Sequence, residues 1–203
     1  MLTLIASSTK WSNWRQSRPS LKECFMVTST AINASKVHLR LLTEDDLEMT
    51  LAWRNRDEVR RWFKHSDLVT LENHRAWFRQ HQLVDDALMF IVENNETREP
   101  VGQVSIYAID REIGEAEVGR FIAAPGASGK GFIRDAIEAL VAFAFGELQL
   151  QRVFLEVFTD NTRAIRLYES LGFVHIDADR PTTCGIDRAV VFMERRAALN
   201  VAP

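Results

Sequence analysis

Apolar residues alternate with polar residues in several short stretches of the chain, beginning with Val37, Leu39 and Leu41. A period of two is typical of a strand with one buried face. The pattern predicts strands over residues 37–42, 87–93, 100–109, 115–123, 152–158, 173–176 and 189–194. The polar turn at 94–97 joins the second and third of these strands into a hairpin.

Segments with helical spacing of apolar residues lie between these strands. Thr43 precedes three acidic residues and predicts a helix start, and Thr70 predicts another. Further helical segments are expected over 58–63, after Gly131 and after Asn161. Strands and helices in this order predict an α/β (α+β) fold with a mixed sheet.

The composition is that of a globular chain. With 203 residues, of which 46% are hydrophobic, it is long enough for one well-buried domain and short for two. Its net charge of -3 comes from interspersed acidic and basic residues, which argues against a basic face that holds nucleic acid. Small-molecule or protein substrates are the better expectation.

Targeting signals and cysteine motifs add little. No apolar run approaches the roughly 18 residues that a membrane-spanning helix needs, and the run at 2–6 is too short for the core of a signal peptide. Cys24 and Cys184 lie far apart without a Cys-x-x-Cys motif, which predicts neither a disulfide framework nor a metal site. We therefore expect a soluble protein of the cytoplasm that does not bind a membrane.

Residues 1–35 differ from the rest of the chain because they are rich in Ser and Thr and show no sustained period. We expect them to form an N-terminal extension that is disordered or not native, with Met26 as a candidate start. Alternatively, tryptophans in this segment cover an apolar patch. The domain itself is expected over 36–197, followed by a tail at 198–203.

The stretch 156–173 joins the end of a strand to a short helix. Asn161 has a side-chain oxygen suited to capping the helix start, and Gly172 is placed to end the helix. Tyr168 lies on the apolar face of this helix, and Glu156 lies on the strand before it. An acid and a base are therefore expected to flank one cleft.

A glycine-rich loop leads into the helix after Gly131. It reads Ser128-Gly129-Lys130-Gly131-Phe132-Ile133. Glycines let the backbone approach a ligand, and free amides at the positive end of a helix dipole bind a pyrophosphate. The loop therefore predicts an anion site that suits coenzyme A.

The helix after Asn161 carries a specific pattern. This pattern resembles the late motif of the GCN5-related N-acetyltransferases (the GNAT superfamily), and the glycine-rich loop lies about 30 residues before it, as in that superfamily. The matching residues are Asn161, Ala164, Leu167, Tyr168, Glu169, Gly172 and Phe173. The resemblance implies a GNAT fold. In that fold a mixed sheet of six to seven strands splays between two central parallel strands and is flanked by about four helices.

The resemblance also implies acetyl-coenzyme A as cosubstrate, and direct attack of an amine on the acetyl group. By position, Asn161 contacts the cosubstrate and Tyr168 protonates the departing thiolate, for which its ordinary pKa near 10 is suitable. The strand at 115–123 parts from its neighbour and binds the pantetheine arm. The implied cosubstrate site comprises Phe121, Ile122, Ala123, Ser128, Gly129, Lys130, Gly131, Phe132, Ile133, Asn161, Ala164 and Tyr168.

Two residues depart from the usual loop pattern of the superfamily. Ser128 stands where Gln or Arg is common, and Ile133 stands where Gly or Ala is common. The branched Ile133 is expected to crowd the cosubstrate side and to alter the loop geometry without abolishing binding.

The general base has two candidates. Glu156 matches by position the base proposed for ribosomal-protein acetyltransferases, and Glu117 is the alternative. Sugar-nucleotide N-acetyltransferases of this superfamily often have another residue at the position of Glu117, so its role stays open. Glu156 itself is either a base, a solvent-facing carboxylate or a partner of Arg163.

A narrower resemblance concerns the acceptor. Residues 53–55, 59–62 and 71–74 resemble sugar-nucleotide N-acetyltransferases of the pseudaminic acid pathway, which implies Arg54 and His74 as ligands of a UDP-linked amino sugar. Alternatively, Arg54 is a surface cation paired with Asp57 or Glu58, and His74 is a polar residue in the first turn of its helix.

Ribosomal-protein N-terminal acetyltransferases share part of this pattern, so three readings of the function stay open. They are acetylation of a nucleotide-linked amino sugar, acetylation of a protein N-terminus or another small amine, and noncatalytic binding of acetyl-coenzyme A. A monomer or a homodimer is expected.

Overall fold

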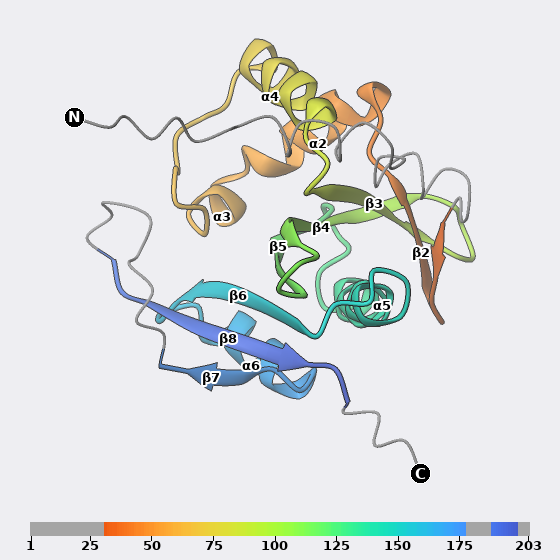
Figure 1. Cartoon of the computed structure of the whole chain (residues 1–203). Coiled ribbons are helices and arrows are strands. Elements are labelled where there is room, and N and C mark those ends of the chain that lie inside the picture. The colour runs from red at the N-terminus through yellow and green to blue at the C-terminus, as the bar shows by residue number, and fades with distance from the viewer. Residues whose placement is uncertain (1–30, 178–187, 199–203) are drawn as a thin grey trace, which may run out of the picture. The chain divides into compact units, whose positions relative to one another are not determined.

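The computed structural model describes residues 31–177 and 188–198. Within these residues one mixed sheet runs in the order β1-β2-β3-β4-β5-β6-β8-β7 (Figure 1). The strands are β1 (Ile32–Asn33), β2 (Val37–Leu41), β3 (Leu88–Asn94), β4 (Pro100–Asp110), β5 (Glu115–Ala123), β6 (Arg152–Phe158), β7 (Val174–Ile176) and β8 (Val190–Arg196). The α/β fold class with a mixed sheet is confirmed.

The centre of the sheet contains its single parallel pairing among the described strands. Glu115–Glu117 of β5 pairs with Arg152–Phe154 of β6, and beyond these residues the two strands part. In β5 the register against β4 shifts between Gln103 and Ser105, and Arg120 has φ +54° there. This β-bulge bends β5 at the place where it leaves β6.

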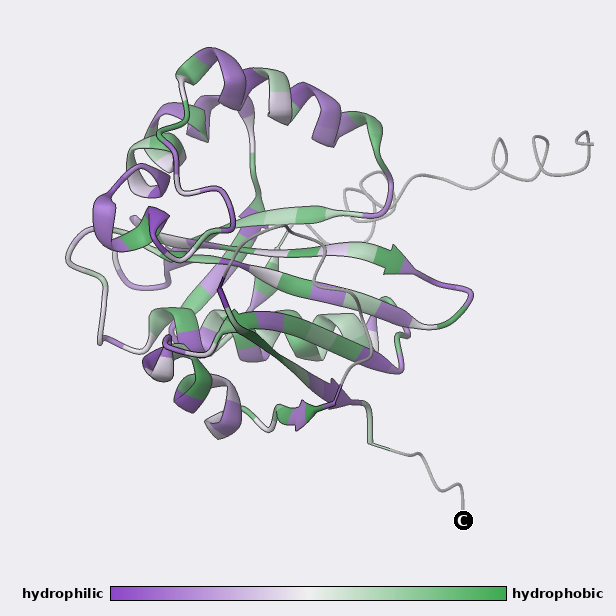
Figure 2. Ribbon diagram, turned by 90° about the vertical axis from the view of Figure 1, so that its left-hand side faces the viewer, coloured by the Kyte–Doolittle hydropathy of each residue, from purple (hydrophilic) through white to green (hydrophobic). Residues whose placement is uncertain are grey.

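Helices cover both faces of the sheet. The turn η1 (Glu44–Asp46) with α2 (Leu47–Arg54), α3 (Asp57–Arg60) and α4 (Leu71–Leu83) lies on one side, and α5 (Phe132–Gly146) lies on the other. Figure 2 shows polar residues on the outer surface of the upper helices and apolar residues along the strands between the layers. The last helix, α6 (Thr162–Ser170), lies beside the β6, β8 and β7 half of the sheet.

The core lies between these layers. The apolar side of α5 is buried on the sheet, and the aromatic rings of Phe143 and Phe90 meet edge to face at 6.1 Å. On the opposite face, Leu47 of α2 and Phe78 of α4 pack with Met89 and Ile91 of β3. Burial of these large side chains holds the helices against the sheet.

The elements follow the sequence pattern closely, with four corrections. The described sheet has eight strands rather than six to seven. The additional strand, β1, lies inside the segment predicted as an extension and pairs with β2. It was not predicted because two residues are too few to show a period. The helix predicted over 58–63 ends at Arg60. The helix predicted from Thr43 starts as the 3-10 turn η1, and the described chain has five α-helices rather than about four.

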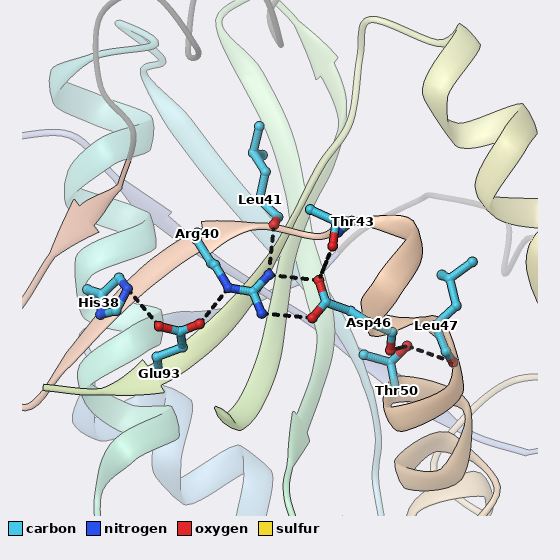
Figure 3. A network of polar contacts seen from close by, with 8 residues as sticks. All are labelled: His38, Arg40, Leu41, Thr43, Asp46, Leu47, Thr50 and Glu93. Atoms are coloured by element: carbon cyan, nitrogen blue, oxygen red, sulfur yellow. Dashed lines mark hydrogen bonds and ion pairs between the residues drawn. The ribbon is translucent and has the colours of Figure 1, made fainter. Parts of the chain in front are cut away.

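A polar network fastens β2 to the start of the first helical segment. Figure 3 shows Arg40 between Asp46, which accepts two hydrogen bonds at 2.7 Å, and Glu93, which also pairs with His38 at 2.9 Å. The Asp46 carboxylate also accepts hydrogen bonds from the backbone and hydroxyl of Thr43, both at 2.9 Å. The network fixes the direction in which η1 and α2 leave the sheet.

The sequence also predicts a polar loop over residues 177–187, before the last strand, and residues 178–187 lie outside the described residues. In the described part of the chain, no helix has both the length and the apolar character to cross a membrane.

Candidate functional site

A cavity of about 1030 Å³ opens where β5 and β6 part. Four parts of the chain supply most of its lining: the segment 54–65, β5, the glycine-rich loop with the first turn of α5, and α6 with the end of β6. Tyr107 of β4 and Val190 of β8 also line it. Parted parallel strands leave backbone donors and acceptors without partners in the sheet, so a ligand can pair with them. The splay predicted between the central strands is therefore also where the cavity lies.

The glycine-rich loop uses left-handed backbone conformations. Gly129 has φ +81° and Gly131 has φ +85°, values that residues with a side chain rarely adopt. A Cβ on Gly129 would meet nothing within 4 Å, so this part of the backbone is open to a ligand. Gly131 is the N-cap of α5, and a Cβ there would stand 3.4 Å from the Lys36 amine.

The bulk of Ile133 is accommodated by the sheet. Its Cδ1 atom would lie only 2.5 Å from a Cβ on Gly102 of β4, so the missing side chain of Gly102 makes room for it. Ile133 also lines the cavity. Part of the crowding expected on the cosubstrate side is thus absorbed by Gly102.

Local capping positions α6. The Asn161 side-chain oxygen accepts a hydrogen bond from the Ala164 amide at 3.3 Å, which confirms Asn161 as the N-cap. At the other end Gly172 has φ +81°, and the amides of Gly172 and Phe173 each donate a 3.0 Å bond back into the last turn of the helix. Both ends of the helix are therefore set by residues of the sequence motif.

Tyr168 projects from α6 into the cavity. Its ring lies between Phe121 of β5 at 6.0 Å and Phe173 at 6.1 Å. Burial raises the pKa of Tyr168 above its ordinary value, so the hydroxyl keeps its proton at neutral pH. A protonated phenol at this position can donate to a developing anion.

Glu156 is almost enclosed. Its side chain is 7% exposed, and one carboxylate oxygen, Oε2, forms an ion pair with Lys64. The other oxygen, Oε1, is buried without a hydrogen-bond partner and belongs to a residue that lines the cavity. The alternatives of a solvent-facing carboxylate and of a pair with Arg163 were wrong, because neither fits this geometry.

Glu117 lies on the same face of the sheet as Glu156, since it is in register with Phe154, two residues before Glu156. It accepts a hydrogen bond from the Tyr107 hydroxyl at 2.7 Å. Burial and the neighbouring Glu117 carboxylate raise the pKa of Tyr107. The guanidinium of Arg120 lies 4.4 Å from the Tyr107 ring, so a cation stands close to this pair.

The two predicted acceptor ligands lie in different surroundings. Arg54 lines the cavity, its guanidinium lies 4.0 Å from the ring of Phe63, and its Nη1 atom is buried without a partner. The carboxylates of Asp57 and Glu58 form ion pairs with Arg60 and Arg56 instead. The alternative that Arg54 pairs with one of these acids was therefore wrong.

His74 does not line the cavity. It contacts the Thr50 hydroxyl at 3.2 Å and stacks on Trp77 at 5.3 Å. Burial, and then the charge of Arg54, lower the pKa of His74, so the ring is neutral at neutral pH. In this structure His74 supports the α2 and α4 packing, and only Arg54 of the pair faces the cavity.

The cavity brings together nearly all residues predicted for the cosubstrate. Lys130 is the exception, because it lies on the exposed side of the loop. Several lining residues were not predicted, and three of them are Lys64, Tyr107 and Arg120. No local motif identifies these three residues. The positive φ of Arg120 could not be predicted from the sequence either, because an arginine rarely adopts one.

The loop and α5 fit the diphosphate of acetyl-coenzyme A. The open backbone at Gly129, the helix start at Phe132 and the Lys36 amine beside Gly131 place donors and positive charge together. The aromatic rings of Phe121 and Tyr168, which both line the cavity, suit the thioester end.

Residues 36–174 match the acetyltransferase (GNAT) domain family. The chain is 26% identical over 145 residues to the uncharacterized N-acetyltransferase YoaA of Bacillus subtilis, covering 70% of this chain and 81% of that protein. It is 27% identical over 140 residues to the spermidine N(1)-acetyltransferase of Vibrio cholerae, covering 69% and 80%. It spans only 28% of a longer uncharacterized relative from Methanocaldococcus jannaschii, to which it is 28% identical over 140 residues.

Solved structures share the fold. The spermidine N-acetyltransferase from Vibrio cholerae in complex with coenzyme A and spermine superposes with a TM-score of 0.71 at 24% identity, covering 79% of this chain and 95% of that one. FdhC, a nucleotide-linked sugar GNAT, superposes with a TM-score of 0.68 at 18% identity, covering 82% and 89%.

The family match extends over the parted strands, the glycine-rich loop and the capped helix α6, which line the cavity. The predicted superfamily and cosubstrate are therefore confirmed. We conclude that this chain belongs to the GNAT acetyltransferase family and is an acetyl-coenzyme A-dependent N-acetyltransferase that acts on an amine.

Proposed function

We propose that the acceptor is a small anionic molecule carrying a primary amine, most specifically a nucleotide-linked amino sugar. The observation that supports this proposal is the group of cationic side chains that line the cavity outside the glycine-rich loop. It includes Arg54, Arg61 and Lys64 of the segment 54–65 and Arg120 of β5. The whole chain has a net charge of -3, so this concentration of positive charge is local.

Arg54 supports an anionic ligand most directly. Burial, and then the nearby charge of Arg60, lower the pKa of its guanidinium, and Nη1 has no hydrogen-bond partner. A buried N–H group without an acceptor costs about 1–3 kcal/mol. A phosphate or carboxylate oxygen of the acceptor would satisfy Nη1 and offset the positive charge, since guanidinium groups bind phosphates with paired hydrogen bonds.

The same charges disfavour a polyamine. The fold occurs both in a spermidine N-acetyltransferase and in a nucleotide-linked sugar GNAT, so it does not choose between these acceptors. The carboxylates of Glu117 and Glu156 could attract cations. However, Glu117 already accepts a hydrogen bond from Tyr107, and Glu156 already forms an ion pair with Lys64. A polycation would therefore meet more repulsion than attraction in this cavity.

In the proposed reaction the acceptor amine loses a proton to Glu156 and then attacks the acetyl carbon. Oε1 of Glu156, buried and without a partner, is the oxygen free to accept that proton. Tyr168 keeps its own proton at neutral pH and donates it to the thiolate that leaves. Glu117, whose carboxylate accepts a bond from Tyr107, is the alternative base.

The experiment is release of thiol from acetyl-coenzyme A by the purified full chain. The acceptor panel contains UDP-linked amino sugars, spermidine, N-terminal peptides and aminoglycosides. Turnover with the nucleotide sugars is expected, with KM raised about tenfold or more in Arg54→Ala because a charged hydrogen bond of roughly 1.5–3 kcal/mol is lost. The control variant is Arg79→Ala, which removes an exposed arginine of α4 that does not line the cavity.

Turnover confined to spermidine or aminoglycosides would refute the anionic acceptor. Turnover confined to peptides would assign the enzyme to N-terminal acetylation. An unchanged KM in Arg54→Ala with a nucleotide sugar would keep the acceptor class and remove Arg54 as its ligand.

A further inference from the structure

Lys64 places an amine of the protein itself on the carboxylate proposed as base. It lies in the segment between α3 and α4, its side chain is 33% exposed, and its Nζ pairs with Glu156 Oε2. Both residues line the cavity together with Tyr168. The carboxylate that would take a proton from an acceptor amine therefore already contacts a lysine amine.

This contact has the chemistry of an acceptor complex. In the proposed function, an acceptor enters as an ammonium group and contacts Glu156 in the cavity that Tyr168 also lines. Lys64 presents the same ammonium group to the same carboxylate. It also borders a second cavity of about 530 Å³, lined by Asp57 and Arg188 among others, so space exists for the side chain on either side.

We propose that Lys64 occupies the place of the acceptor amine and that the enzyme acetylates Lys64 Nζ when no acceptor is present. The proposal rests on the role of Glu156 in the proposed function. It does not depend on which acceptor the enzyme uses.

The step balances without any further reactant. Lys64 gives one proton of its ammonium group to Glu156, and the neutral Nζ attacks the thioester carbonyl carbon. The N–C bond forms, the C–S bond breaks, and Tyr168 protonates the departing sulfur. Tyr168 regains a proton from the amide nitrogen through water, and Glu156 releases its proton to solvent, so the products are acetyl-lysine, free coenzyme A and one proton.

Acetylation would also change the site. An acetylated Lys64 carries no charge and cannot pair with Glu156, and its acetyl group would fill part of the space where the acceptor binds. Labelled enzyme should therefore turn over acceptor more slowly than unlabelled enzyme.

The test incubates the full chain with acetyl-coenzyme A and no acceptor, then locates acetyl groups by intact mass and peptide mapping. We expect one acetyl group, on Lys64, with a first-order rate that does not depend on protein concentration. Lys130 is the internal control, because it is exposed in the glycine-rich loop and direct chemical acetylation would label it at least as fast. Any acceptor that the enzyme turns over should slow the labelling.

Three variants separate enzymatic labelling from direct chemistry. Lys64→Arg keeps a cation beside Glu156 but lacks a nucleophilic amine, so its label should disappear. Glu156→Gln and Tyr168→Phe should each slow labelling of Lys64 about 100-fold, the usual loss for a positioned acid or base. Circular dichroism verifies that each variant is folded, and calorimetric titration verifies that it binds acetyl-coenzyme A.

Labelling of Lys64 at equal rates in all variants that retain it, or labelling of Lys130 as fast as Lys64, would overturn the proposal. So would the absence of label on Lys64 in enzyme that binds acetyl-coenzyme A. Turnover of a nucleotide sugar without label on Lys64 would overturn only this inference and leave the proposed function standing. Label on Lys64 without turnover of any nucleotide sugar would overturn the proposed acceptor and leave this inference standing.

Discussion

At the scale of single residues, the two candidate bases differ in what holds them. Glu117 and Glu156 lie on the same face of the sheet, next to the point where β5 and β6 part. Glu117 accepts a hydrogen bond from a tyrosine that keeps its proton, whereas Glu156 has an ion pair on one oxygen and no partner on the other. No protein donor competes for the second oxygen of Glu156, so Glu156 is the stronger candidate.

Glu156→Gln is expected to lower kcat about 100-fold or more, because the amide cannot accept the amine proton. Glu117→Gln should lower kcat much less, since the Tyr107 hydroxyl can still donate to the amide oxygen. Steady-state thiol release from acetyl-coenzyme A measures both variants. A larger loss in Glu117→Gln would transfer the role of base to Glu117.

Tyr168→Phe is expected to lower kcat about 100-fold while the affinity for acetyl-coenzyme A changes little. The ring contacts with Phe121 and Phe173 persist in the variant, and only the proton donor is lost. Kinetics and calorimetric titration with acetyl-coenzyme A provide the two readouts. Full turnover in the variant would exclude Tyr168 as the general acid.

At the scale of elements, the buried network on β2 sets where the acceptor side of the cavity begins. Arg40 and Asp46 join β2 to η1, and α2 continues from η1 to Arg54 (Figure 3). Burial alone would raise the pKa of Asp46, but hydrogen bonds from Arg40 and Thr43 outweigh it and lower the pKa below the ordinary value. The folded state therefore favours the ionised carboxylate.

Asp46→Asn is expected to lower the free energy of unfolding by about 2 kcal/mol at neutral pH, as for other hydrogen bonds to charged groups. Because the folded pKa of Asp46 is depressed, this stability is present above its unfolded pKa of about 3.9. It is lost as the pH falls through the lower folded value. Urea unfolding at several pH values measures the difference between wild type and variant, which should shrink in acid.

Asp45→Asn serves as the matched control, because Asp45 is an exposed neighbour in the same turn. It should change stability by less than about 0.5 kcal/mol. The difference in unfolding free energy between Asp46→Asn and wild type could also stay constant down to strongly acidic pH. This result would show that Asp46 stabilises the fold by packing rather than by its charge.

At the scale of the whole molecule, charge is distributed unevenly. Among the described residues that line the cavity, seven are arginine or lysine and four are aspartate or glutamate. Arg134 and Arg163 belong to α5 and α6, and the other cations belong to the segment 54–65 and to β5. A cavity lined by one sign of charge concentrates ligands of the opposite sign.

Salt is therefore expected to raise KM for an anionic acceptor. The Debye length falls from about 30 Å at 0.01 M to about 10 Å at 0.1 M ionic strength, so attraction by the cavity weakens over this range. KM measured at fixed saturating acetyl-coenzyme A separates this effect from cosubstrate binding. A KM that falls with salt would indicate a cationic acceptor instead.

The sequence by itself determined most of the fold and the cosubstrate side of the cavity. Strands with a period of two, a helix capped by Asn161 and ended by Gly172, and a loop with Gly129 and Gly131 are local features. Neighbouring residues decide them, because capping and left-handed turns depend on backbone geometry within a few positions. The structure therefore reproduces these elements within a few residues.

Only the tertiary structure decided the acceptor side. Lys64 meets Glu156, and Tyr107 meets Glu117, through contacts between elements distant in the sequence that no local pattern encodes. The same packing turns Arg54 into the cavity and leaves His74 outside it, although both residues belong to one sequence resemblance. Side-chain direction depends on how α2 and α4 are placed on the sheet, and long-range burial sets that placement.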